Sequence, residues 1–232
     1  MALPELTWQF VYARLAWALV LAALVVATWP RAWRMPRAVV GGIAGASLLL
    51  MLLPGAASPA WHLGLAFQYP SGLLAGLCAA RLHARWADRR DTVLMPPRFA
   101  AVLAVCGTVL YLDAFGLLAR GYYYAGFGLG AAVLAVVLAG ASALAFKRGH
   151  GRVQACAVLG AVALFSFTRL PTGNLADALL DPLLCAWALF SLGQAALRAL
   201  LRRGARPQLA PLPQDLPALR SAGVEPFSPI KE

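Results

Sequence analysis

The residues best suited to chemistry in this chain gather in the stretch YLDAFGLLARGYYYAGFG, at positions 111–128. It places a carboxylate, Asp113, and a guanidinium, Arg120, beside three consecutive tyrosines and between two long apolar runs. A carboxylate can act as a general base, and a guanidinium can hold a phosphate. Aromatic rings can stack on a sugar or a lipid headgroup. This stretch therefore marks the first candidate functional site.

The depth of Asp113 in its apolar run predicts a partner on another helix. A charge at mid-membrane costs about 2.5–3.5 kcal/mol, and less toward the edge. Asp113 lies five residues before the end of its run, at a depth of about 7–8 Å, and Arg14 lies six residues into the first run, at about 9 Å. We therefore expect an ion pair between Arg14 and Asp113, with Arg120 and Arg169 as rival partners. A lock that fixes helix register and a functional site are both open interpretations.

Further polar residues are expected on the same outward face. Gln68 and Tyr69 precede Pro70, which should kink their helix because proline cannot donate a helical hydrogen bond. The three consecutive tyrosines are interpreted first as an aromatic belt at the membrane surface and second as a stacking platform. The expected outer rim is Tyr122, Tyr123 and Tyr124.

The segment TRLPTGNLADALLDP, at 168–182, contains two helix-start signals. Asn174 with Asp177 three residues later resembles a helix N-cap, and Asp181 before a proline is a second cap. Two carboxylates could instead bind a cation or act as acid and base, but capping is the preferred interpretation. The expected outward polar pocket comprises Gln68, Tyr69, Arg120, Arg169, Asn174, Asp177 and Asp181.

No known catalytic pattern accompanies these residues. The sequence contains no HExxH, G-x-S-x-G or Walker loop, and its three histidines fall near helix ends on differing sides. The four cysteines lie in four separate apolar runs with no CxxC pair, which favours small buried residues over a metal site. We expect no catalytic residue, metal or cofactor.

The composition identifies the elements that must position these groups. The chain has 232 residues, of which 61% are hydrophobic and 12% charged, so lipid must be the solvent for most of its surface. The net charge of +11 comes from cations that cluster in short segments between apolar runs, which indicates orientation signals and argues against nucleic-acid binding. Arginine-, alanine- and leucine-rich usage indicates a GC-rich bacterial genome.

Seven apolar runs are long enough to be predicted as membrane helices. They cover 8–29, 38–54, 61–81, 99–118, 126–146, 151–168 and 182–202, and the second and sixth are short. Glycines four residues apart, such as Gly72 and Gly76, favour close helix packing within the bundle over a dimer seam. The expected fold is an all-α polytopic bundle over 1–203, followed by a disordered, proline-rich cytoplasmic tail over 204–232.

The cations predict the orientation of the bundle. Seventeen lysines and arginines fall on one side of the seven runs, and only Arg14, Arg120 and Arg169 fall on the other. Positive residues favour the cytoplasm, so the N-terminus is expected outside and the C-terminus inside. The loop 82–98 should lie on the cytoplasmic side, where it could form a short interfacial helix.

Three functions remain open for a protein of the bacterial inner membrane. The first is a non-catalytic accessory subunit of an envelope complex that makes or exports a polysaccharide or lipid-linked glycan. Its partners would be the lipid bilayer and other membrane proteins. The second is an enzyme acting on a lipid-linked substrate at the outer leaflet, and the third is a small transporter. The inner halves of the helices hold no carboxylate, which weighs against a pump or channel.

Overall fold

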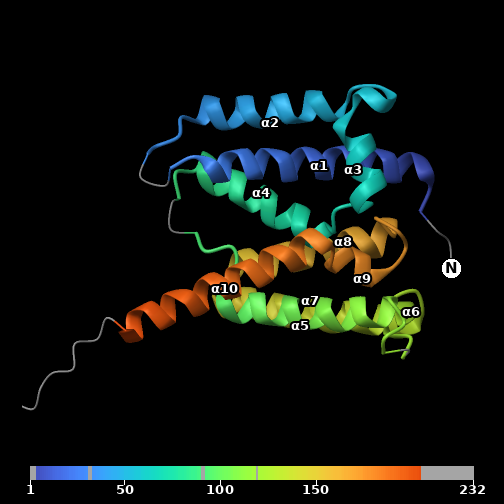
Figure 1. The fold of residues 1–232 in the computed structure, drawn as a ribbon. Coiled ribbons are helices and arrows are strands. Elements are labelled where there is room, and N and C mark those ends of the chain that lie inside the picture. Colours follow the sequence, from blue (N-terminus) through green and yellow to red (C-terminus); the bar gives the residue numbers. More distant parts are fainter. Residues whose placement is uncertain (1–3, 31–32, 90–91, 119, 205–232) are drawn as a thin grey trace, which may run out of the picture. The chain divides into compact units, whose positions relative to one another are not determined.

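The computed structural model describes residues 4–30, 33–89, 92–118 and 120–204, with only the backbone at 203 and 204 (Figure 1). These residues form helices joined by turns, with no strand among them. In chain order the elements are α1 (Leu6–Thr28), α2 (Arg37–Met51), η1 (Gly55–Ala57), α3 (Pro59–Phe67), α4 (Gly72–Trp86), α5 (Pro97–Ala114), α6 (Tyr122–Ala125), α7 (Leu129–Lys147), α8 (Arg152–Thr168), α9 (Leu175–Leu179) and α10 (Pro182–Gly204). The all-α class is as predicted.

Within the part of the chain that the structure describes, four helices are long and apolar enough to cross a membrane. They are α1, α5, α7 and α10 over Pro182–Arg202, while α2 and α8 are apolar but shorter. The chain therefore has the character of a multi-pass membrane protein. The contacts divide it into a unit of Met1–Ala195 and a second unit from Ala196, of which the last part of α10 is described. The tail predicted at 204–232 lies outside the described residues after Gly204.

The third predicted run, 61–81, is two helices instead of one kinked helix. α3 ends at Phe67, Gln68 adopts a positive φ of 59°, and α4 begins only at Gly72. Pro70 explains the break, because it can neither donate a hydrogen bond nor allow a helical residue before it. The Ser71 side chain then accepts the N–H of Leu74, which gives α4 a cap of its own. α4 also continues to Trp86, five residues into the expected loop at 82–98.

The fourth predicted run, 99–118, is also shorter than expected. α5 ends at Ala114, and Gly116 follows with a left-handed φ of 78° that favours glycine. Asp113 is therefore in the last turn of α5, nearer to the helix end than the sequence suggests. The remaining runs begin and end within three residues of their predicted limits.

The first unit is built around α1, α4 and α8. α1 packs on α2 and α4, α4 packs on α8, and α8 packs on α7 (Figure 1). Small residues permit the α4–α8 contact: a Cβ at Gly72 would lie 3.2 Å from the Cα of Ala161, and one at Gly76 would lie 3.3 Å from the Cα of Ala157. The close packing expected for this glycine pair is thus an intrachain contact.

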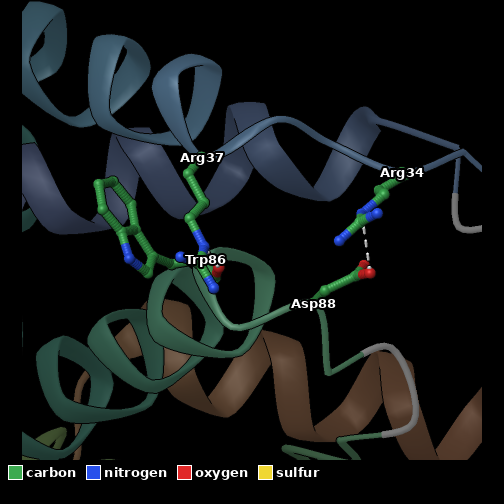
Figure 2. Close-up of polar contacts among 4 residues, drawn as sticks. All are labelled: Arg34, Arg37, Trp86 and Asp88. Carbon is green, nitrogen blue, oxygen red and sulfur yellow. Dashed lines mark hydrogen bonds and ion pairs between the residues drawn. The ribbon is translucent and has the colours of Figure 1, made fainter.

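Side-chain contacts at one end of the helices join the end of α4 to both sides of the α1–α2 turn. Arg37 Nε donates to the carbonyl oxygen of Trp86 at 3.2 Å, and Arg34 forms an ion pair with Asp88 at 3.1 Å (Figure 2). Arg85 donates to the carbonyl oxygen of Trp29 at 3.3 Å. We call this the basic end. It comprises the ends of α1, α4 and α7 and the starts of α2, α5 and α8.

Candidate functional site

The end of the helices opposite the basic end is called the polar end, and it comprises α6, α9, the end of α5 and the starts of α1, α4 and α10. At this end, the carboxylate of Asp113 is held by the backbone that follows its own helix. Oδ1 accepts the N–H groups of Arg120 at 2.8 Å and Gly121 at 3.0 Å, and Oδ2 accepts that of Tyr123 at 3.0 Å. The side chain is only 7% exposed. A carboxylate that accepts several backbone N–H bonds is satisfied as an anion without a cation beside it. Asp113 thus fixes the turn that leads into α6.

The expected ion pair between Arg14 and Asp113 does not form, although the structure describes both residues. Both carboxylate oxygens already accept backbone hydrogens, and Arg14 lies on α1, which packs mainly on α2 and α4. Arg120 contacts Asp113 through its backbone N–H, while its side chain is exposed. The matching depths inferred from the sequence also assumed an α5 four residues longer than the one observed.

Tyr123 connects this turn to the segment before α10. Its hydroxyl donates to Oδ2 of Asp177 at 3.0 Å, and the hydroxyl of Thr172 donates to the same oxygen. Burial raises the pKa of Asp177, although these two hydrogen bonds oppose the shift. Burial and the adjacent carboxylate of Asp177 raise the pKa of Tyr123 to about 12, so its phenol stays protonated as the donor.

Asn174 joins the same hydrogen-bond network from a buried position. It is fully buried, and its Oδ1 accepts the N–H of Ala176, which confirms the predicted cap of α9. Its Nδ2 donates to the carbonyl oxygen of Tyr123 at 3.0 Å. A Cβ at Gly126 would lie 1.8 Å from Oδ1 of Asn174, so only glycine fits there. Leu175 also donates its N–H to the Gly126 carbonyl at 3.1 Å.

Asp181 holds two helix starts together. Its Oδ1 accepts the N–H of Leu184 at 2.8 Å, which confirms the predicted cap of α10. Its Oδ2 accepts the N–H of Ser71 at 2.8 Å, at the start of α4. Beside it, the Tyr12 hydroxyl of α1 donates to the carbonyl oxygen of Pro70 at 2.7 Å. One carboxylate therefore joins two segments that lie 110 residues apart in the sequence.

The other residues expected in an outward pocket do not join this hydrogen-bond network. Gln68 is exposed at the end of α3, and Tyr69 is partly buried against the core. The Arg169 guanidinium lies over the ring of Phe165, 5.0 Å from its centroid. Tyr122 and Tyr124 are 52% and 75% exposed, as a belt or a stacking platform would require.

The sequence analysis missed four participants: Tyr12, Ser71, Thr172 and Gly126. Ser71 carried a signal, because a serine between a proline and an apolar run is a typical helix cap. Gly126 carried a weaker one as part of a glycine-rich turn. Tyr12 binds a segment that is distant in the chain, and Thr172 acts within a turn whose path no local pattern predicts.

No known protein family, curated protein or solved structure matches this chain. The polar end must therefore be interpreted from its own chemistry. Among the residues that the structure describes, no three His, Cys, Asp or Glu side chains are placed to hold a metal ion. The polar end instead joins α6, α9 and the starts of α4 and α10 through buried or partly buried acceptors, whose partners are backbone N–H groups and neutral hydroxyls.

Proposed function

We propose that this chain is a non-catalytic accessory subunit of a bacterial envelope complex, embedded in the inner membrane. Seven helices, α1, α2, α4, α5, α7, α8 and α10, would cross the bilayer, with the N-terminus outside and the C-terminus in the cytoplasm. Support comes from the cations, which gather at the basic end within the first unit, while Arg14, Arg120 and Arg169 lie at the polar end. A polysaccharide or a lipid-linked glycan is the proposed cargo of the complex.

The use of the carboxylates carries the non-catalytic part of the proposal. A general base needs a lone pair within hydrogen-bond reach of its substrate. Asp113 and Asp181 instead use both of their oxygens to accept backbone N–H groups of the same chain. Asp177 accepts two hydroxyls at one oxygen. Carboxylates bound in this way to groups of their own chain suit residues that fix helix ends and loops more than residues that react.

The exposed surface of α7 supports a partner-binding role. Only Ala131 and Ala135 of its 19 residues are buried, and large side chains such as Leu129, Val133 and Val136 are more than 60% exposed. In a bilayer these side chains face either lipid tails or the helices of another protein. Both surroundings are apolar, so the exposed side chains suit either one. α7 is thus available as a docking helix without any rearrangement of the bundle.

Affinity purification tests the proposal directly. The chain would be tagged at its C-terminus, extracted from native membranes in mild detergent, and its retained proteins identified by mass spectrometry. We expect a stoichiometric membrane-protein partner that is lost when Val133 and Val136 are changed to tryptophan. In the matched control, Val102 and Val105 of α5, which are also exposed, are changed to tryptophan instead. Recovery of a single chain carrying a lipid-linked glycan would reject the accessory function in favour of an enzyme.

A further inference from the structure

A cavity of about 670 Å³ opens at the basic end, between the start of α5, the last turns of α7 and the start of α8. Its volume is within the range of small-molecule sites in proteins. The inner walls are apolar and include Phe99, Ala145, Ala155 and Val158. Val158 is six residues into α8, so the cavity reaches about 9 Å from the helix start toward the middle of the bundle.

Arg98 makes the mouth of the cavity cationic, because this residue lines the cavity and is exposed at the second residue of α5. His150 also lines the cavity. Both α5 and α8 begin at this cavity, and neither start has a side-chain cap. Uncapped first-turn N–H groups carry partial positive charge and attract anions. Asp88 forms an ion pair with Arg34, so this carboxylate already has a cation of its own.

Gln154 holds the wall between the two helix starts. It is 8% exposed, and its Nε2 donates to the carbonyl oxygens of Val93 at 2.7 Å and Leu94 at 3.0 Å. These bonds fix the segment before α5 against the first turn of α8. Its Oε1 accepts no hydrogen bond from any described residue, so in a cavity that Gln154 lines this oxygen is available to accept a ligand hydroxyl.

We propose that this cavity binds an anionic phospholipid of the leaflet at the basic end. The phosphate would lie between Arg98, His150 and the uncapped starts of α5 and α8. One acyl chain would follow the apolar walls toward Val158, and a headgroup hydroxyl would donate to Gln154. Basic pockets between membrane helices bind anionic headgroups through the same combination of charge and apolar depth.

The arrangement favours a lipid over a soluble phosphate compound. A soluble anion would use the cationic mouth and leave the apolar interior empty, whereas a phospholipid fills both. The inference requires the helix ends at the basic end to lie at a membrane surface. It does not depend on the accessory-subunit function, so the lipid titration and the partner purification can fail independently.

Native mass spectrometry of the full-length protein in detergent tests the proposal, with titration by phosphatidylglycerol and, separately, phosphatidylcholine. We expect phosphatidylglycerol to bind more tightly, and Arg98→Gln to weaken its binding about tenfold, or about 1.4 kcal/mol. Phosphatidylcholine binding should change little. Arg148→Gln is the matched control, because Arg148 is an exposed cation of the same end that does not line the cavity.

A second variant addresses the interior without altering charge. Ala141→Phe places a ring in the cavity from α7, at an exposed position where the fold has room for it. We expect it to abolish tight phosphatidylglycerol binding while the protein remains monodisperse. Equal affinity for the two lipids, or equal losses from Arg98→Gln and Arg148→Gln, would overturn the proposal. So would full competition by millimolar inorganic phosphate, which would assign the mouth to a soluble anion.

Discussion

The carboxylate of Asp113 accepts the backbone N–H of Tyr123 at 3.0 Å, and the hydroxyl of the same Tyr123 donates to Asp177 at 3.0 Å. A single tyrosine thus connects the end of α5 to the segment before α10. The polar end is held by a chain of hydrogen bonds that runs through the backbone, where the sequence suggested a pair of opposite charges. Its stability should therefore depend on acceptors more than on cations.

Removing the Asp113 acceptor should destabilise the protein. Asp113→Ala leaves three backbone N–H groups without their partner, and we expect the free energy of unfolding to fall by about 3 kcal/mol. Asp113→Asn retains one acceptor oxygen and should cost less, about 1–2 kcal/mol. Thermal unfolding in detergent, followed by intrinsic fluorescence, measures both.

Arg14 provides the control for Asp113. Because Arg14 and Asp113 form no ion pair, Arg14→Gln should leave the unfolding temperature nearly unchanged. Exchanging the two residues, Arg14→Asp with Asp113→Arg, should not restore stability. Rescue by this exchange would show that the charge pair operates in the membrane and would refute the backbone-clamp interpretation.

The sequence predicted most helices because apolar length and flanking cations are local signals. The caps at Asn174 and Asp181 were predicted for the same reason, since each is followed at once by its helix. The break at Gln68–Ser71 was underestimated as a kink. Proline signals a disruption, but whether the chain resumes as the same helix depends on the Ser71 contact with Asp181, 110 residues later.

The partner of Asp113 was not predictable by the same means. The cost of a buried charge led us to expect a cation beside Asp113. Backbone N–H groups were not considered as partners, because inside helices they are normally hydrogen-bonded already. α5 ends early at Ala114, and the glycine-rich turn that follows exposes the N–H groups of Arg120, Gly121 and Tyr123 to the carboxylate. The path of that turn is a tertiary property, and no periodicity in the sequence specifies it.

The pH dependence of stability should identify Asp177. Burial raises its pKa in the folded protein above the unfolded value of about 3.9. Its contribution to stability is therefore full below that value and is lost as pH rises through the folded pKa. Asp177→Asn keeps an oxygen for Tyr123 and Thr172 but cannot ionise. The unfolding temperature of this variant should increase relative to that of the native protein as pH rises from acidic to neutral.

Tyr123→Phe is the companion variant for Asp177. It removes a hydroxyl that donates to Asp177, and we expect a loss of about 1–3 kcal/mol in the free energy of unfolding. It should also steepen the decline of stability with rising pH, because a hydrogen bond that lowers the pKa of Asp177 is gone. A pH profile unchanged by either variant would exclude Asp177 as the titrating group.

The contact between Gly126 and Asn174 predicts a sharp steric effect. Gly126→Ala would place a methyl group 1.8 Å from Oδ1 of Asn174, so this cap must move and α9 must lose its first hydrogen bond. We expect a loss of about 2–3 kcal/mol from overpacking and cap disruption. Gly45→Ala is the control: a Cβ there meets nothing within 4 Å and should stabilise α2 by up to about 1 kcal/mol.

The number of membrane crossings can be tested at α8. Its 17 residues span about 25 Å, less than the bilayer core of about 30 Å. Local thinning and Arg169 at its end, whose long side chain can reach the surface, can compensate for such a mismatch. If α8 crosses, alkaline phosphatase fused after Gly149 should be inactive, and after Gly173 active, because the two glycines would face opposite sides. Equal activities would show that α8 does not cross the membrane. The number of crossings would then fall below seven, closer to the four long helices. The same comparison between fusions after Arg34 and after Gly55 decides whether α2, with 15 residues, also crosses.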